Sequence, residues 1–287
     1  MPEVPEVETM RRGIGPCIGT RIQEIEIVAS PRRPIAIVPK PAAFYKRLRG
    51  ATIVGTDRAG KRVVVLLDTG DRLIFEPRMT GLVLLADPPS PEHLRLRLRL
   101  ECNNKAPDRR KKIELLYWDR RGLGSVRLMN PAEFATAFGA ERLGPDALGA
   151  TAEIFAQRLG ASRRAIKVAL LDQRNVAGIG NLYAAEILHR ARVHPAMPCR
   201  RLRPEAWQRI ATATRHILAA AIRYEGSTLS DGTYRNALNQ SGSYQNHHRV
   251  YDREGEKCRR CRKHEVRRIV QAQRATFFCP GCQAKTR

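Results

Sequence analysis

The sequence holds 287 residues, of which 52 are Lys or Arg and 28 are Asp or Glu, so the formal net charge is +24. At 43% apolar residues the chain is too hydrophobic for a disordered basic tail, and its length predicts two domains with a sizeable core. The positive charge predicts a polyanionic partner, with nucleic acid first and an anionic membrane surface as the competitor. No stretch approaches the roughly 18 apolar residues of a spanning helix, and residues 1–6 lack the features of a signal peptide. We therefore expect a cytoplasmic protein with no membrane span.

The first part of the chain has the pattern of a β-rich domain. Residues 6–14 have helical character and meet glycines at positions 13 and 15, after which the apolar period is mostly two as far as residue 129. The clearest strand segments are residues 25–27, 52–54, 63–67, 73–75, 94–100, 113–118 and 125–129. Residues 94–100 alternate strictly between Leu and Arg, which predicts one buried face and one cationic face. We expect residues 103–112 to form an exposed basic loop, and the antiparallel strands to build a sandwich or barrel.

After residue 130 the pattern becomes helical. Residues 131–139 predict a helix, residues 144–145 a linker, and residues 151–225 follow a period of 3.6. Ser162 predicts the N-cap of a helix over residues 165–171, and Pro204 the start of a long helix that ends at Gly226. Residues 227–247 are rich in Gly, Ser and Asn and predict a mobile loop before a small cysteine module. The prediction is an α+β chain with domains over residues 1–130, 131–226 and 227–287.

Four cysteines near the C-terminus have the spacing of a structural zinc site. Cys258 and Cys261 form one pair, and Cys279 and Cys282 form a second pair seventeen residues later. Each pair can present two thiolates to one tetrahedral Zn²⁺ ion, which would supply the folding energy of so short a module. Redox cysteines or disulfides are the alternative, and they fit a reducing compartment poorly. Residues 269–278 predict a cationic hairpin that could grip DNA, with a solvated basic surface as the alternative reading.

A glycine-rich turn joins two helical segments near the middle of the chain. Gly178 and Gly180 permit a tight turn, and Asn181 then stands at the start of the next helix. Exposed N–H groups and the helix dipole attract phosphate at such a position. Taken alone, this pattern also fits an ordinary helix connection.

The N-terminus could carry a reactive amine. Removal of Met1 would make Pro2 the first residue, with a secondary amine that titrates at about pH 8. Such an amine forms an iminium with an aldehydic sugar carbon, and this cation is a strong electron sink. Glu3 and Glu6 are near enough in sequence to move protons. The alternative is ordinary: acidic residues commonly stand at the start of a helix.

Three motifs together resemble one family. Residues 1–9, 178–181 and 273–279 occur in the order and at the separations of the formamidopyrimidine-DNA glycosylase family of DNA repair enzymes. The likeness covers essentially the whole chain, and the first motif is more similar to the oxidised-purine branch than to the endonuclease VIII branch. The resemblance implies an N-terminal β-sandwich, a helix–two-turn–helix domain and a C-terminal zinc-finger hairpin.

The resemblance also implies catalytic roles for matching positions. Pro2 would be the nucleophile at the sugar C1′, and Glu3 the general acid/base that helps to open the sugar. Glu6 would support the active site, and Lys61 would contact a phosphate near the lesion. Arg274 would act with Asn181 on the phosphates of the kinked strand.

Other matching positions would hold the DNA open. Met79 and Arg121 would fill the space left by the flipped nucleotide, with Leu123 as the wedge. Lys167 would approach the damaged base. The sequence departs from the family at Glu76, where histidine is usual, and at Leu123, where phenylalanine is usual. Residues 103–112 are a third departure, because they look like an insertion.

The expected function is that of a bifunctional DNA glycosylase and AP lyase. It would excise 8-oxoguanine or formamidopyrimidines from duplex DNA through the Pro2 iminium, then cut the strand by β,δ-elimination. We expect one structural Zn²⁺, a partner in double-stranded DNA with damaged or abasic sites, a monomer, and association with the nucleoid. Two alternatives stay open: a non-catalytic binder of damaged DNA, and an RNA-binding zinc protein.

Overall fold

The computed structural model describes residues 2–29, 33–102 and 113–285. The predicted basic loop at residues 103–112 lies outside these ranges. By packing, the chain forms two compact units: residues 1–139 with 224–243, and residues 140–223 with 244–287. The division expected from the sequence, at residues 130 and 226, stays a prediction about folding domains. Within the described ranges, no helix is long and apolar enough to cross a membrane.

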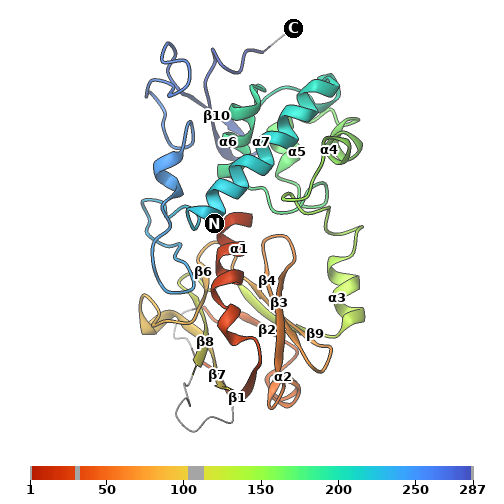
Figure 1. Cartoon of the computed structure of the whole chain (residues 1–287), viewed down its shortest axis with the longest axis vertical. Coiled ribbons are helices and arrows are strands. Elements are labelled where there is room, and N and C mark those ends of the chain that lie inside the picture. Colours follow the sequence, from red (N-terminus) through yellow and green to blue (C-terminus); the bar gives the residue numbers. More distant parts are fainter. Residues whose placement is uncertain (1, 30–32, 103–112, 286–287) are drawn as a thin grey trace. The chain divides into compact units, whose positions relative to one another are not determined.

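Two β-sheets form the first unit (Figure 1). One sheet has the order β1-β7-β8-β6, with bounds β1 Thr20–Ile27, β7 Leu94–Cys102, β8 Ile113–Asp119 and β6 Gly81–Leu84. The other has the order β2-β9-β5-β4-β3, with bounds β2 Ala36–Val38, β9 Ser125–Met129, β5 Arg72–Glu76, β4 Val63–Leu67 and β3 Ile53–Arg58. All neighbouring strands are antiparallel except the short pair β2 and β9, which is parallel. This confirms the predicted α+β class with an N-terminal sandwich.

A single apolar core lies between these sheets and the first helix. Ile22, Leu98, Phe75 and Val65 come from both sheets and are fully buried in it. Helix α1 (Val4–Gly13) adds Val7 and Met10, and it packs on β3, β4 and β6. Helices α2 (Pro41–Leu48) and α3 (Pro131–Phe138) and short 3₁₀ turns at Gly15–Cys17 and Pro91–His93 complete the unit. Burial of apolar area at about 25 cal/mol per Å² makes this core the main source of the unit's stability.

The alternating strand β7 is not the open cationic face that its sequence predicts. Its leucines are buried as expected. Arg97 instead pairs with Glu26 at 2.9 Å, and Arg99 contacts both Glu24 and Glu114. The partners come from β1 and β8, which lie on either side of β7 in the sheet. The alternating pattern of β7 does not predict these ion pairs, because the carboxylates belong to other strands.

Residues 224–243 pack with the first unit, although they follow the helices of the second in sequence. The sequence predicts a mobile loop here because apolar residues are few. Tyr234 and Ala237 nevertheless belong to the core of the sandwich unit, and the N–H of Leu85 donates to the carbonyl of Ala237 at 2.8 Å. These two core residues and hydrogen bonds of this kind hold the segment, despite its low apolar content.

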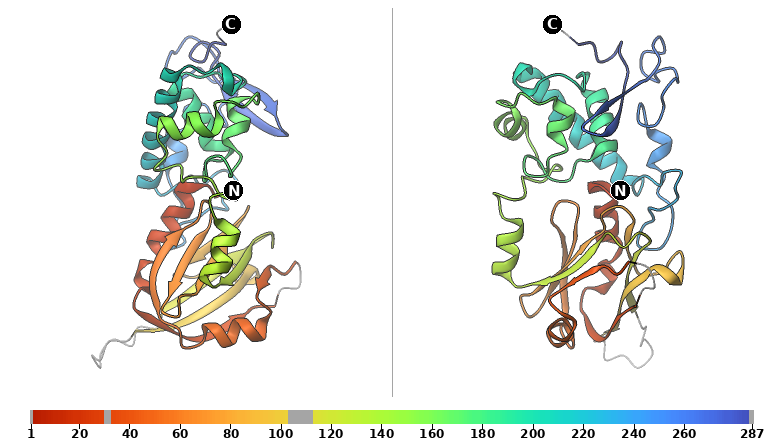
Figure 2. Two further views of the ribbon diagram at one scale, coloured as in Figure 1. Left: turned by 90° about the vertical axis from the view of Figure 1, so that its right-hand side faces the viewer. Right: turned by 180° about the vertical axis from the view of Figure 1, so that it is seen from behind.

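The second unit is helical with a terminal hairpin (Figure 2). Its helices are α4 Ala152–Leu159, α5 Ile166–Leu170, α6 Asn181–Ala191 and α7 Pro204–Arg223, with 3₁₀ turns at Cys199–Arg201 and Tyr244–His247. The hairpin joins β10 (Arg267–Gln271) to β11 (Arg274–Phe278), and β11 packs on α6. The predicted N-cap at Ser162 is wrong, because α5 begins after Ala165. The Ser162 hydroxyl accepts instead from the N–H of Arg164 at 3.2 Å, within the loop.

Candidate active site and zinc centre

One buried carboxylate anchors the backbone near the start of the chain. Glu6 Oε2 accepts from the N–H of Glu3 at 2.9 Å, reaching back one turn of α1. Its other oxygen, Oε1, accepts from the N–H of Ser227 at 2.9 Å. Glu3 and Glu6 are 4% and 3% exposed, and Pro2 is buried with them. The Glu6 carboxylate therefore anchors the backbone of Glu3, the residue that follows Pro2.

Gly226 permits this close approach. Its φ is +80°, and a Cβ there would lie 3.0 Å from the Glu6 carboxylate and 2.9 Å from the Tyr234 ring. The Tyr234 hydroxyl donates to the backbone carbonyl of Glu6 at 3.4 Å. Burial raises the pKa of Tyr234 well above its usual value, and the nearby Glu6 charge adds to the shift, so this hydroxyl remains a donor at neutral pH. Position 226 therefore requires glycine for two reasons: its backbone is left-handed, and a side chain would collide with Glu6 and Tyr234.

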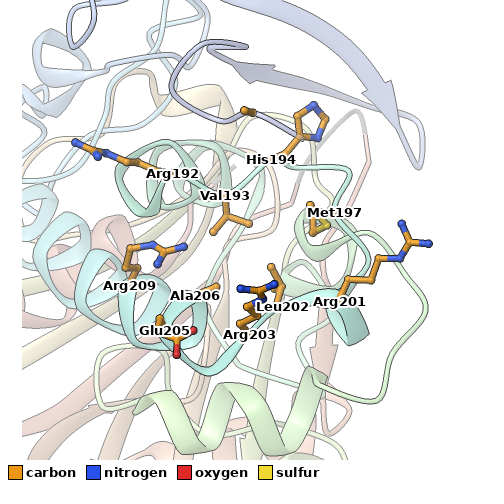
Figure 3. Close-up of a pocket in the computed structure, with 11 residues that line it drawn as sticks. Arg192, Val193, His194, Met197, Arg201, Leu202, Arg203, Glu205, Ala206 and Arg209 are labelled. Carbon is orange, nitrogen blue, oxygen red and sulfur yellow. The ribbon is translucent and has the colours of Figure 1, made fainter. Parts of the chain in front are cut away.

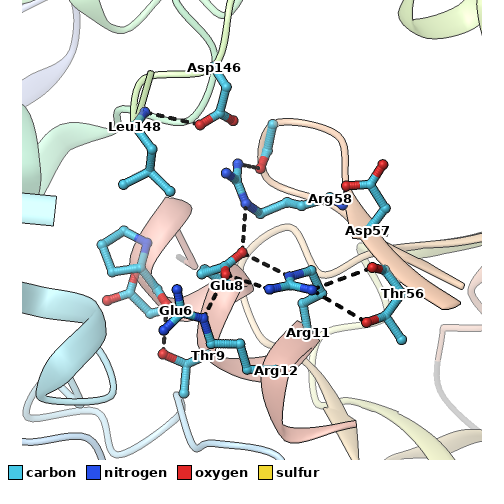
Figure 4. A network of polar contacts seen from close by, with 12 residues as sticks. Glu6, Glu8, Thr9, Arg11, Arg12, Thr56, Asp57, Arg58, Asp146 and Leu148 are labelled. Carbon is cyan, nitrogen blue, oxygen red and sulfur yellow. Dashed lines mark hydrogen bonds and ion pairs between the residues drawn. The ribbon is translucent and has the colours of Figure 1, made fainter. Parts of the chain in front are cut away.

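A second carboxylate of α1 gathers three arginines (Figure 4). Glu8 accepts from Arg11 and Arg12 at 2.7 Å each, and from Arg58 on β3 at 3.3 Å. Burial alone would raise the pKa of the Glu8 carboxyl, but the hydrogen bonds from Arg11 and Arg12 outweigh it and lower the pKa to about 2. Glu8 was not predicted from the sequence, where the acidic start of a helix in a basic chain is its only signal.

The same network reaches the turn that carries Lys61. Arg58 Nη1 donates to the carbonyl of Gly60 at 3.0 Å, and Gly60 has a φ of +57°. Ala59 and Arg62 exchange two backbone hydrogen bonds, of 3.1 and 3.2 Å, which close the turn between β3 and β4. Lys61 is half-buried at its tip. The position of Lys61 is thus tied through Arg58 and Glu8 to the N-terminal helix.

Asp119 brings together two of the segments predicted to fill the DNA helix. Its fully buried carboxylate accepts from the Thr80 hydroxyl and from the N–H groups of Arg121 at 3.2 Å and Gly124 at 2.8 Å. Met79 precedes Thr80 and is 40% exposed, and Arg121 is also exposed. Leu123 is half-buried in the same turn. Asp119 was not singled out from the sequence, because its partner Thr80 is 39 residues away.

In the second unit, Asn181 is the first residue of α6 and faces the hairpin. Its Nδ2 donates to the carbonyl of Ala275 at 3.0 Å, and its Oδ1 accepts from Lys167 Nζ at 2.5 Å. Lys167 is fully buried and also donates to the Thr276 hydroxyl at 2.8 Å. Arg274, next to Ala275, is exposed at the start of β11. Asn181 therefore contacts Ala275, the hairpin residue next to Arg274. The buried Lys167 contacts both Asn181 and the hairpin.

The four predicted cysteines form one cluster. Their sulfur atoms lie within 4.8 Å of one another, with Cys258 to Cys282 at 3.9 Å and Cys261 to Cys279 at 3.7 Å. A tetrahedral ion with Zn–S bonds of about 2.3 Å needs sulfur separations of about 3.8 Å, so the donor set fits zinc. None of these four cysteines forms a disulfide, so all four thiols are available to a metal ion. The bound ion would be structural, because four sulfurs leave no open position.

Two buried side chains of α6 connect this module to the helices. Glu186 accepts from the backbone N–H groups of Arg249, Val250 and Tyr251 at 2.9 to 3.0 Å. His189 Nε2 lies 3.5 Å from Cys258 Sγ. Burial raises the pKa of Glu186, although the three N–H donors oppose that rise. Neither residue was predicted, since their partners are more than 60 residues away in sequence.

A cavity of about 630 Å³ lies elsewhere in the second unit (Figure 3). It is lined by apolar residues, among them Val193, Met197 and Ala206, and by the arginines Arg192, Arg201, Arg203 and Arg209. None of the predicted site residues lines it. The predicted residues instead form separate groups, around Glu6 and Asp119 in the first unit and around Asn181 in the second.

Comparison with known proteins covers all of these groups. Residues 1–126 match the model of the formamidopyrimidine-DNA glycosylase N-terminal domain, and residues 143–233 match the model of its H2TH domain. Residues 255–285 match a zinc finger found in FPG and IleRS. The formamidopyrimidine-DNA glycosylase of Chloroflexus aurantiacus is 38% identical over 285 residues, covering 99% of this chain and 98% of that protein. That of a Methylobacterium species is 39% identical, with 99% of both chains covered.

Solved structures agree. The chain superposes on Lactococcus lactis Fpg in a complex with abasic-site DNA with a TM-score of 0.84, at 32% identity over 99% of this chain and 100% of that one. MutM (Fpg) from Thermus thermophilus gives a TM-score of 0.82 at 35% identity, with 100% of both chains covered. Both the sequence matches and the fold extend over nearly the whole length, so the protein belongs to the formamidopyrimidine-DNA glycosylase family.

Proposed function

We propose that this DNA glycosylase excises oxidised purines, such as 8-oxoguanine and formamidopyrimidines, from duplex DNA and cleaves the strand at the resulting abasic site. The single observation that carries the proposal is the anchoring of the chain start by Glu6, through the N–H groups of Glu3 and Ser227. A nucleophile at the N-terminus needs such an anchor, because a freely moving terminus would lose the advantage of fixed orientation.

In the proposed reaction, the Pro2 nitrogen, freed by removal of Met1, attacks the sugar C1′. The bond from C1′ to the base nitrogen breaks, and the base leaves with its electron pair and a proton. Glu3 gives a proton to the ring oxygen as the sugar opens, and the secondary amine is left as a charged iminium. Loss of a C2′ proton then expels the 3′ phosphate, a second elimination expels the 5′ phosphate, and water releases the sugar fragment from Pro2.

The other predicted residues have supporting tasks in this proposal. Lys61 is expected to contact a phosphate beside the lesion, and Asn181 with Arg274 to bind the phosphates of the bent strand. Met79, Arg121 and Leu123 would occupy the space vacated by the flipped nucleotide, which offsets the few kcal/mol that flipping costs. The net charge of +24 supports an expected association with chromosomal DNA in the nucleoid.

The folded zinc module would position the hairpin residues that are expected to contact DNA. Cys258, Cys261, Cys279 and Cys282 would hold one Zn²⁺, whose chemistry is to fold the module rather than to take part in the reaction. Through β11 the folded module carries Arg274 and the carbonyl of Ala275 that binds Asn181.

Excision from a small panel of damaged duplexes tests the proposal. The methionine-processed protein should release 8-oxoguanine and formamidopyrimidine and cut the strand, and Glu3→Gln should slow base release at least a hundredfold, the lower end of typical acid–base contributions. Exposed Glu92→Gln is the matched control and should act as the wild type does. Tight binding of abasic-site DNA without any cleavage would instead identify a non-catalytic binder of damage.

A further inference from the structure

The carboxylate at position 76 is not free to repel DNA. Glu76 closes β5, is 8% exposed, and uses one oxygen, Oε1, to accept from Arg62 at 3.0 Å and from Arg78 at 2.9 Å. The Ser125 hydroxyl donates to its other oxygen at 3.4 Å. One negative and two positive charges leave this group at a net +1. The group around position 76 therefore has a net positive charge, although glutamate stands where the family usually has histidine.

Arg62 forms the fixed side of the group. It directly precedes β4, where Val63 pairs with Phe75, so it stands across from Glu76 at the end of the strand pair. Its guanidinium lies 4.8 Å from the centre of the Phe138 ring, and its side chain is 22% exposed. The Nε of Arg62 is buried with no hydrogen-bond partner in the part of the chain that the structure describes. Packing on both sides therefore limits the movement of Arg62.

Arg78 forms the open side. Its side chain is 59% exposed, and its φ of +51° is uncommon for a residue other than glycine. The Glu76 carboxylate engages Nε, and among the described residues no hydrogen bond or ion pair involves either terminal nitrogen. Met79, the predicted filler of the DNA helix, is the next residue. The ion pair at Nε thus holds an exposed guanidinium beside Met79, with its two terminal nitrogens available as donors.

We propose that Arg78 is a phosphate-binding residue for the DNA backbone next to the Met79 insertion, and that Glu76 is the positioning residue that orients it. A guanidinium held at Nε can still present both Nη groups to the two oxygens of a phosphate. The proposal rests on the proposed function, because it assigns a further contact to the same DNA-binding surface.

Salt dependence tests the contact directly. Each phosphate contact contributes about 0.9 to the slope of log K against log salt concentration for duplex DNA. R78Q should lower that slope by about 0.9 and weaken binding roughly tenfold at low salt, equally for damaged and undamaged duplex. R49Q, at the exposed C-cap arginine that follows α2, is the matched control for lost charge. A slope for R78Q equal to that of R49Q would overturn the proposal.

A double-mutant cycle tests the role of Glu76. By charge alone, E76Q should tighten DNA binding, because it removes a negative charge. If Glu76 orients Arg78, E76Q should weaken binding in the wild-type background and should not weaken it when R78Q is already present. Weakening of equal size in both backgrounds, or tightening in the wild type, would contradict the positioning role. If E76Q fails to fold, the R78Q slope decides alone, since Arg78 is exposed.

Failure of this inference can be distinguished from failure of the proposed function. A wild-type protein that excises the lesion while R78Q keeps the control slope refutes only the phosphate contact. A wild-type protein that binds DNA without excision refutes the enzymatic proposal, and the salt slopes of the variants still test Arg78.

Discussion

Lys167 Nζ lies 2.5 Å from Asn181 Oδ1, and both side chains contact the hairpin strand β11. The Lys167 ammonium is fully buried, whereas the side chain of Arg274 on the same strand is exposed. Isolated buried charges are costly, and three acceptors offset the cost here: Asn181 Oδ1, the Thr276 hydroxyl and the Ala275 carbonyl. The relationship makes Lys167 a support for Asn181 at the start of α6.

Replacement of this lysine should damage DNA binding through Asn181. Lys167→Met keeps the aliphatic volume but leaves buried acceptors without a donor, at a cost of about 1–3 kcal/mol in stability. We expect abasic-site affinity to fall on the order of tenfold, and Asn181→Ala to add little further loss in the same chain. Binding titrations of the two single variants and the double variant measure this. Exposed Lys285→Met should behave as the wild type, and additive losses would contradict the coupling.

Zinc removal should unfold the C-terminal module and leave the sandwich folded. The wild type should bind one zinc per chain, and Cys279→Ser should lower that content and expose the amides of β10 and β11 to hydrogen exchange. Cys102→Ser, in the first unit and outside the cluster, should retain the metal. Metal analysis measures the zinc content, and hydrogen-exchange mass spectrometry measures the protection of the hairpin amides. Protection of the hairpin that persists after complete chelation would show that the module folds without metal.

The Glu8 network predicts a specific loss of stability in acid. The folded-state pKa of about 2 lies below the ordinary value of 4.5, so the ionised carboxylate stabilises the fold above about pH 4.5. This contribution is lost as pH falls towards 2. Glu8→Gln should therefore lower the thermal midpoint by several degrees at pH 7, and by progressively less between pH 5 and pH 2. Exposed Glu92→Gln is the control, and a difference independent of pH would refute the pairing.

The parts of the fold that follow from local pattern were predictable. Residues 63–67 and 125–129 are strands with the predicted bounds, because continuous apolar runs between turn residues specify buried strands. The hairpin and the cysteine cluster also follow from spacing. Ser162 failed as an N-cap, since a loop hydrogen bond to Arg164 competes for the same hydroxyl.

The parts that depend on distant partners were not predictable from local pattern. Glu8 is joined to Arg58 across fifty residues, and Asp119 to Thr80 across thirty-nine. Residues 227–243 have the composition of a loop, yet Ser227 binds Glu6 from a distance of 221 residues. The family resemblance identified Pro2 and Asn181 as candidates, whereas only the three-dimensional structure shows what positions their neighbours.

The most direct test of the account is to identify the atom that becomes attached to DNA. Methionine-processed protein is incubated with abasic-site duplex and borohydride, and the trapped complex is digested and sequenced by mass spectrometry. We predict that the sugar fragment is reduced onto the nitrogen of Pro2, and that protein retaining Met1 traps none. An adduct on a lysine side chain, or no adduct from processed and folded protein, would contradict the account.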